Sequence, residues 1–121
     1  MDLTTIFVIV IAVGAFLIYR QSGLVNVDLA RQYLKSGAVV IDVRSPREFE
    51  SSHLQGALNV PMGQLRHDIG THVPDRKQVL LLHCLSGTRS GMARRTLKGL
   101  GYANCYNLGS YGRAQQIVEG N

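Results

Sequence analysis

The sequence predicts an α/β fold in which helices cover both faces of a parallel sheet. Uninterrupted apolar runs at residues 38–41 and 79–82 are typical of strands buried on both sides. Segments whose apolar residues recur at helical spacing separate these runs, so strand and helix alternate along the chain. Alternation of this kind favours crossover connections and a parallel sheet.

Composition limits the chain to one domain and excludes several classes of protein. It has 121 residues, of which 45% are hydrophobic, and we find no internal repeat or low-complexity tract. Its two cysteines are too few for a disulfide framework, and neither lies in a CxxC pair or beside a histidine cluster. We therefore expect no metal site.

The net charge of +5 comes from 13 basic and 8 acidic side chains. A basic domain can attract nucleic acid, an acidic membrane surface or a small anion. The basic residues are scattered, however, and neither an aromatic stripe nor an arginine-rich arm accompanies them. We expect a solvated basic surface that steers small anions, and no nucleic-acid partner.

The first 20 residues form a separate unit. From Leu3 to Tyr19 there are 17 residues without a charge. As a helix at about 1.5 Å per residue they span ~25 Å, slightly less than a ~30 Å hydrocarbon core. We expect residues 1–20 to be a transmembrane anchor that contacts the membrane through residues 3–19; a signal peptide and a buried core helix are the alternatives.

Charges on either side of this segment predict its orientation. Arg20, Arg31 and Lys35 follow it, whereas only Asp2 precedes it. The positive-inside tendency then gives a single-pass protein whose C-terminal domain, residues 21–121, faces the cytoplasm. We expect residues 21–23 to be a short polar linker between the two parts.

Capping signals locate the helices of the domain. Asn26 is placed to begin a helix that Gly37 ends. Ser45, with proline next and Glu48 three residues on, has the pattern of a capping box. The remaining expected elements are a weak strand at 57–60, a helical turn within 62–69, a helix to about residue 98, a strand at 103–108 and a helix at 111–118.

Residues 83–90, with the sequence HCLSGTRS, connect a buried strand to a helix. Gly87 allows a tight turn, Thr88 or Ser90 can cap the following helix, and the amides of the turn can point inward around one centre. Such a nest, with the positive end of a helix behind it, stabilises a thiolate. Cys84 is therefore a candidate nucleophile at the carboxyl edge of the sheet.

The stretch from Cys84 to Arg89, CLSGTR, resembles the six-residue active-site loop of rhodaneses. The resemblance continues upstream, in the order and rough spacing of a single-domain rhodanese, and covers the chain from about Leu24 to its C-terminus. The matching positions upstream are Asp42, Val43, Arg44, Glu48, Phe49, His53, Leu54, Gln55, Gly56, Ala57, Asn59 and Pro61.

This resemblance implies a sulfurtransferase with a rhodanese-like sheet. The Cys84 thiolate would take sulfane sulfur from a small anionic donor such as thiosulfate and pass it, as a persulfide, to a thiol, a protein or cyanide. The substrate-binding residues that the resemblance implies are Leu85, Ser86, Gly87, Thr88, Arg89, Ser90 and Arg44. No organic cofactor is required.

Other residues are expected to be structural. Cys105 lies inside an apparent strand, His83 should point to the sheet face opposite Cys84, and Arg44 should form an ion pair with Glu48.

Two other functions remain open. Cysteine phosphatases and arsenate reductases have similar loops, but place one residue more between cysteine and arginine than the four found here. The shorter loop favours a cup for a single sulfur atom. The other alternative is a membrane-tethered rhodanese-like module that binds or senses without turnover.

Overall fold

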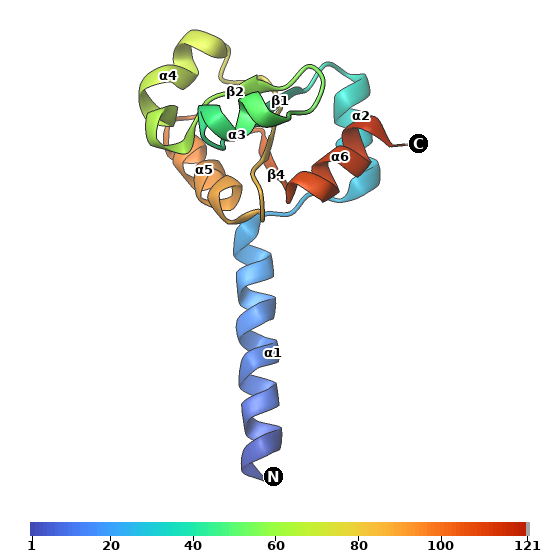
Figure 1. Ribbon diagram of the computed structural model, residues 1–121. Coiled ribbons are helices and arrows are strands. Elements are labelled where there is room, and N and C mark those ends of the chain that lie inside the picture. Colours follow the sequence, from blue (N-terminus) through green and yellow to red (C-terminus); the bar gives the residue numbers. More distant parts are fainter. Residues whose placement is uncertain (121) are drawn as a thin grey trace.

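The computed structural model describes residues 1–120, apart from the side chains of residues 20–22. Helices and strands alternate along the domain, as predicted (Figure 1). The elements in chain order are α1 (Leu3–Ser22), α2 (Val27–Lys35), β1 (Val39–Asp42), α3 (Pro46–Ser51), β2 (Leu58–Asn59), η1 (Met62–Gln64), α4 (Leu65–His72), β3 (Leu80–His83), α5 (Thr88–Gly99), β4 (Cys105–Gly109) and α6 (Tyr111–Glu119).

Four parallel strands form the sheet in the order β2-β1-β3-β4, which confirms the predicted parallel topology. Because side chains alternate between the faces of a strand, neighbouring residues enter two different cores. Leu80 and Leu82 pack with α4 and α5, whereas Leu81 packs with α2 and α6 on the opposite face. Helices therefore cover both faces, as the uninterrupted apolar runs predicted.

The predicted helix starts in the domain are confirmed at two positions. The Asn26 side chain accepts hydrogen bonds from the amides of Asp28 and Leu29 and begins α2. At the start of α3, Ser45 and Glu48 form the complete capping box. The prediction of a side-chain cap on α5 is wrong: Gly87 occupies that position in a left-handed conformation, and neither Thr88 nor Ser90 caps the helix.

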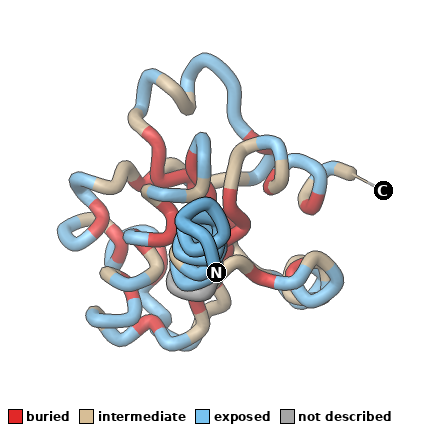
Figure 2. Tube along the Cα trace, turned by 90° about the horizontal axis from the view of Figure 1, so that it is seen from below, coloured by how far each residue is buried: buried red, intermediate tan, exposed pale blue. Residues whose placement is uncertain are grey.

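Helix α1 projects from the domain as a straight stalk (Figure 1). Seen along its axis, it is pale blue around nearly its whole circumference, because its described side chains are almost all exposed (Figure 2). The predicted linker at 21–23 is largely helical, since α1 continues to Ser22 and ends at Gly23 with φ 66°. The chain then joins the sheet at once: the Val25 amide donates to the Asn107 carbonyl at 3.0 Å.

No helix in the described part of the chain is both long and apolar enough to cross a membrane. The prediction of a transmembrane anchor over residues 1–20, with membrane contact through residues 3–19, is therefore not supported. The cytoplasmic placement of residues 21–121 depended on that anchor and stays a prediction.

A buried ion pair ties the end of β1 to its surroundings. The guanidinium of Arg44 donates to both carboxylate oxygens of Asp42, with Nη2–Oδ2 at 2.7 Å, and also to the Ser52 carbonyl at 2.7 Å. Both side chains are almost completely buried. The Asn59 amide donates to the carbonyls of Asp42 and Arg44, each at 3.0 Å, so β2 is fixed to the same turn.

Replacing Asp42 with alanine should lower the free energy of unfolding by about 3–5 kcal/mol, because it leaves the Arg44 guanidinium buried without its carboxylate. Equilibrium unfolding in urea measures the loss. Asp68→Ala is the matched control, since Asp68 pairs with His67 at the surface and its removal should cost at most about 1 kcal/mol. Equal losses for the two variants would contradict the structural role of the buried pair.

Candidate active site

Cys84 follows β3 directly and lies where three strand ends meet. The strand register aligns Asp42 of β1 with His83 of β3, and His83 with Gly109 of β4. The Cys84 amide donates to the Gly109 carbonyl at 3.2 Å, which extends this alignment by one residue. The prediction that Cys84 lies at the carboxyl edge of the sheet is confirmed.

The loop after Cys84 folds back over its sulfur. The Gly87 amide donates to Cys84 Sγ at 3.0 Å, which makes an inward-pointing donor of the kind expected for a nest. Gly87 has φ 95°, and a Cβ at this position would lie 3.3 Å from the Gly109 backbone. The backbone conformation therefore favours glycine, and the Gly109 backbone leaves little room for a side chain. Further along, the Tyr111 amide donates to the Leu85 carbonyl at 3.1 Å and fastens the loop to the start of α6.

Asn107 holds this loop from the neighbouring strand, and sequence reasoning missed it. Its Nδ2 donates to the Gly87 carbonyl at 3.2 Å, while its Oδ1 accepts from the Gly109 amide at 2.8 Å and from the Ser90 hydroxyl at 2.7 Å. Asn107 is completely buried, on β4. An asparagine within an otherwise apolar strand was the signal that could have found it, because a buried amide requires partners.

Hydrogen bonds lower the pKa of the Cys84 thiol. Burial alone would raise it, but the Ser90 hydroxyl, then the amides of Ser90, Gly87 and Ser86, more than offset that effect. The Ser90 hydroxyl lies 3.4 Å from Sγ and only 2.7 Å from Asn107 Oδ1, and it has one hydrogen to donate. The amide of Gly87 is therefore the firmer stabiliser of the thiolate.

The other cysteine lies in the same core but has different hydrogen-bond partners. Cys105 is buried in the core on the α5 side of the sheet, and burial raises the pKa of its thiol. Its sulfur lies near the carbonyl oxygens of Tyr102 and Arg94, which are acceptors and do not stabilise a thiolate. This agrees with the prediction that Cys105 is structural.

The predicted ion pair between Arg44 and Glu48 is wrong. Arg44 forms its ion pair with Asp42. Glu48 instead accepts two hydrogen bonds from Arg89, at 2.7 and 3.0 Å. These bonds lower the pKa of Glu48 to about 2. Arg44 is buried with its guanidinium over the Tyr111 ring, so the structure does not present it to solvent as a substrate-binding cation. Arg89 is partly exposed, at the first turn of α5.

His83 contacts Tyr111 edge-on, on the α6 side of the sheet, while Cys84 packs in the α5-side core. The two side chains therefore face opposite ways, as predicted. Burial lowers the pKa of His83, and its Nε2 lacks a hydrogen-bond partner among the described residues. The nearest carboxylate oxygen is Asp42 Oδ2, 3.7 Å away.

The remaining predicted site residues lie at the rim of the loop. Leu85, Ser86 and Thr88 are exposed, with Leu85 60% accessible, and the Ser86 hydroxyl is 3.4 Å from the Thr88 hydroxyl. Among the residues described, no three histidine, cysteine or acidic side chains gather in a group that could hold a metal ion. The arrangement is a completely buried thiol with a backbone amide directed at its sulfur.

Known proteins with similar sequences carry related domains. Thiosulfate sulfurtransferase PspE of Escherichia coli is 38% identical over 69 residues, which span 57% of this chain and 66% of that protein. The uncharacterised protein YqhL of Bacillus subtilis is 35% identical over 112 residues, covering 84% of this chain and 85% of YqhL.

Solved structures agree in fold. A rhodanese from E. coli, determined with anions, superposes with a TM-score of 0.61 at 34% identity, covering 64% of this chain and 91% of its own. The human single-domain sulfurtransferase TSTD1 gives a TM-score of 0.65 at 27% identity, covering 78% and 96%. Residues 26–112 match the profile of the family described as the rhodanese-like domain. The chain therefore belongs to the rhodanese-like family.

Proposed function

We propose that this protein is a sulfurtransferase that carries sulfane sulfur on Cys84. The observation that carries the proposal is the Gly87 amide that donates to the Cys84 sulfur, in a loop with four residues between cysteine and arginine. Relatives named thiosulfate sulfurtransferase, 30–38% identical, support the same reaction class. Thiosulfate is accordingly the donor with which to test it.

The first step is a displacement at sulfur. The Cys84 thiolate attacks the outer sulfur of thiosulfate, a bond forms between Sγ and that sulfur, and the sulfur–sulfur bond of thiosulfate breaks to release sulfite. In the second step an acceptor thiolate or cyanide attacks the outer sulfur and the Cys84 thiolate leaves. The persulfide anion between the two steps needs hydrogen-bond donors, and the Gly87 amide is already in place.

Arg89 and Arg44 have different roles in this proposal. Arg89 can add positive charge for the sulfonate of the donor, and its bond to Glu48 fixes its side chain at the loop. Arg44 acts through Asp42, by holding the turn after β1, and does not touch the donor. Leu85, Ser86 and Thr88 are the exposed positions that an acceptor meets first.

Cys84→Ser should abolish formation of thiocyanate from thiosulfate and cyanide, because an oxygen nucleophile cannot carry the sulfur. Colorimetric detection of thiocyanate measures the reaction. Cys105→Ser is the matched control and should keep most of the activity, since Cys105 pairs with Leu80 at the opposite end of β4 from the loop after Cys84. Turnover by the Cys84 variant would refute the mechanism.

Alkylation of Cys84 by iodoacetamide should rise with pH around a midpoint below the ordinary thiol pKa of about 8.5, because the folded protein favours the thiolate. Ser90→Ala should move this midpoint upward by removing one donor. Mass spectrometry of labelled peptides distinguishes Cys84 from Cys105, whose raised pKa should leave it much less reactive near neutral pH. A midpoint at or above the ordinary value would contradict the thiolate-stabilising role of the loop.

Arg89→Gln should raise the KM for thiosulfate about tenfold, equivalent to roughly 1.4 kcal/mol, because one charge-assisted contact to the sulfonate is lost. Reaction of the preformed persulfide with cyanide should change much less. Arg47→Gln is the control, since Arg47 is an exposed cation on α3. If the two variants behave alike, the assignment of Arg89 to the donor is wrong.

A further inference from the structure

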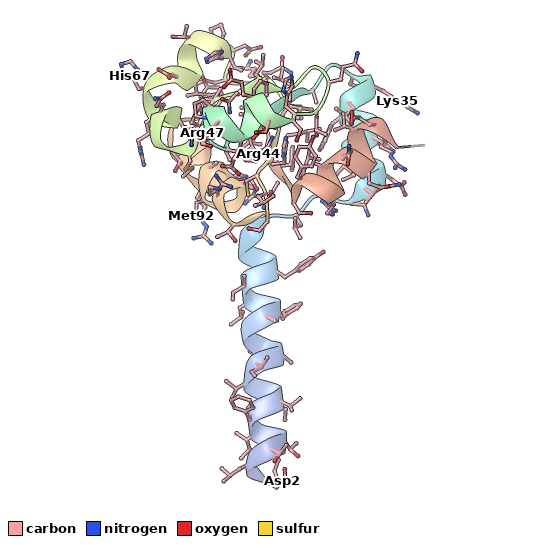
Figure 3. All side chains as sticks on the ribbon, viewed as in Figure 1. Asp2, Lys35, Arg44, Arg47, His67 and Met92 are labelled. Atoms are coloured by element: carbon pink, nitrogen blue, oxygen red, sulfur yellow. The ribbon has the colours of Figure 1, made fainter. Side chains whose placement is uncertain are left out.

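A cavity of about 460 Å³ lies between the C-terminal part of α1 and the loop that follows Cys84. Ala15 and Ile18 of α1 form one side of it, and Ser86, Gly87 and Thr88 form another. Met92, labelled in Figure 3 near the junction of the stalk with the domain, lines a third side from α5. The stalk thus helps to build a compartment beside the loop that encloses Cys84.

The lining of the cavity has an apolar and a polar part. Side chains of Ile18, Leu24 and Met92 give apolar surface. The hydroxyls of Ser86 and Thr88 lie on the loop, and Arg95 adds a cation to the lining from α5. An occupant that matches both parts has an apolar body and a polar group directed toward the loop.

The volume of the cavity indicates the size of the molecule that it can hold. Cavities of about 300–1,000 Å³ accommodate small organic ligands, and this one falls within that range. Thiosulfate does not suit the apolar part, because moving a dianion from water into apolar surroundings is strongly unfavourable. The cavity is therefore better suited to a sulfur acceptor than to the donor.

One residue of the cavity lining, Gly87, also contacts the reactive sulfur. The Gly87 amide donates to Cys84 Sγ at 3.0 Å. A ligand in contact with the 86–88 segment therefore lies next to the residue that holds the reactive sulfur. Leu85, 60% exposed, and Met92, 53% exposed, extend the apolar surface around the same loop.

We propose that this cavity is the acceptor subsite for a small thiol that carries an apolar chain. The inference rests on the proposed sulfur transfer and names the class of its acceptor. The acceptor thiol loses its proton to solvent, and its sulfur attacks the outer sulfur of the Cys84 persulfide. A new sulfur–sulfur bond forms on the acceptor, the bond to Cys84 Sγ breaks, and the products are an alkyl persulfide anion and the Cys84 thiolate.

The test compares straight-chain alkanethiols of two to eight carbons as acceptors for the full chain loaded from thiosulfate. Each methylene that enters the cavity should increase kcat/KM about threefold to fourfold, mainly through KM, until the cavity is filled. Sulfite release under steady state gives the rates. Cyanide, which has no chain, provides the reference reaction. Equal kcat/KM values across the series, with normal persulfide formation, would overturn the subsite and leave the sulfurtransferase intact.

A matched pair of variants on α1 locates the effect. Ile18→Glu places a carboxylate in the apolar wall and should lower kcat/KM for hexanethiol at least tenfold while the cyanide reaction stays unchanged. Val8→Glu makes the same change at another exposed position of the helix, away from the cavity, and should leave both reactions unchanged. Equal losses in the two variants would refute the assignment of the subsite to this cavity.

Binding can also be measured without any reaction. The probe 1-hexanol should shift the methyl resonance of Met92 in Cys84→Ser protein, and Ile18→Glu should abolish the shift. If neither protein shows a shift, the subsite is refuted even where sulfur transfer occurs. If the shift appears but wild-type protein forms no persulfide, the cavity binds apolar molecules and both the sulfurtransferase and the acceptor role are wrong.

Discussion

The hydrogen bond from the Gly87 amide to the Cys84 sulfur is the contact on which the site depends. It requires Gly87 in a left-handed conformation and in close contact with the Gly109 backbone. Gly109 is in register with His83 at the end of β3. The parallel pairing of β3 and β4 therefore determines where the loop after Cys84 lies relative to the Gly109 backbone. Asn107, on the same strand, then holds the Gly87 carbonyl. The sheet thus places the Gly87 amide against the Cys84 sulfur, and this amide can stabilise the thiolate without an ionisable side chain.

The two arginines that were predicted to bind the donor have separate roles because their environments differ. Arg44 is buried with Asp42, where a lone guanidinium would be strongly unfavourable, and the pair joins β1 to the turn and to β2. Arg89 pairs with Glu48 in partly exposed surroundings, where such a pair contributes about 1 kcal/mol or less to stability. The buried pair therefore supports the fold, and the exposed pair leaves a cation within reach of solvent.

Much of the fold could be predicted because its signals are local. The apolar run before His83, the capping box at Ser45 and the asparagine that begins α2 each determine an element from adjacent residues. The cap of α5 was missed because both hydroxyl residues lie inside the helix, and a glycine with positive φ precedes them. The helix continues through residues 21 and 22 because polar residues do not by themselves end a helix, whereas Gly23 does.

Features of the site that could not be predicted depend on contacts between distant segments. Spacing placed Glu48 beside Arg44, but the fold brings Arg89, 41 residues away, to the same carboxylate. Asn107 reaches the loop only through strand pairing, and the cavity under the stalk exists only because α1 packs near α5. Cys84 itself was predictable, since nucleophile, glycine and helix start are contiguous in the chain.

The most direct test of the account is the intact mass of the full-length protein before and after treatment with thiosulfate, without reductant and with Cys84→Ser alongside. The account predicts a gain of about 32 Da, one sulfur atom, on the parent chain alone, and loss of that sulfur when cyanide or a thiol is added. An unchanged mass in the parent, or the same gain in the variant, would contradict the central claim that Cys84 carries the sulfur.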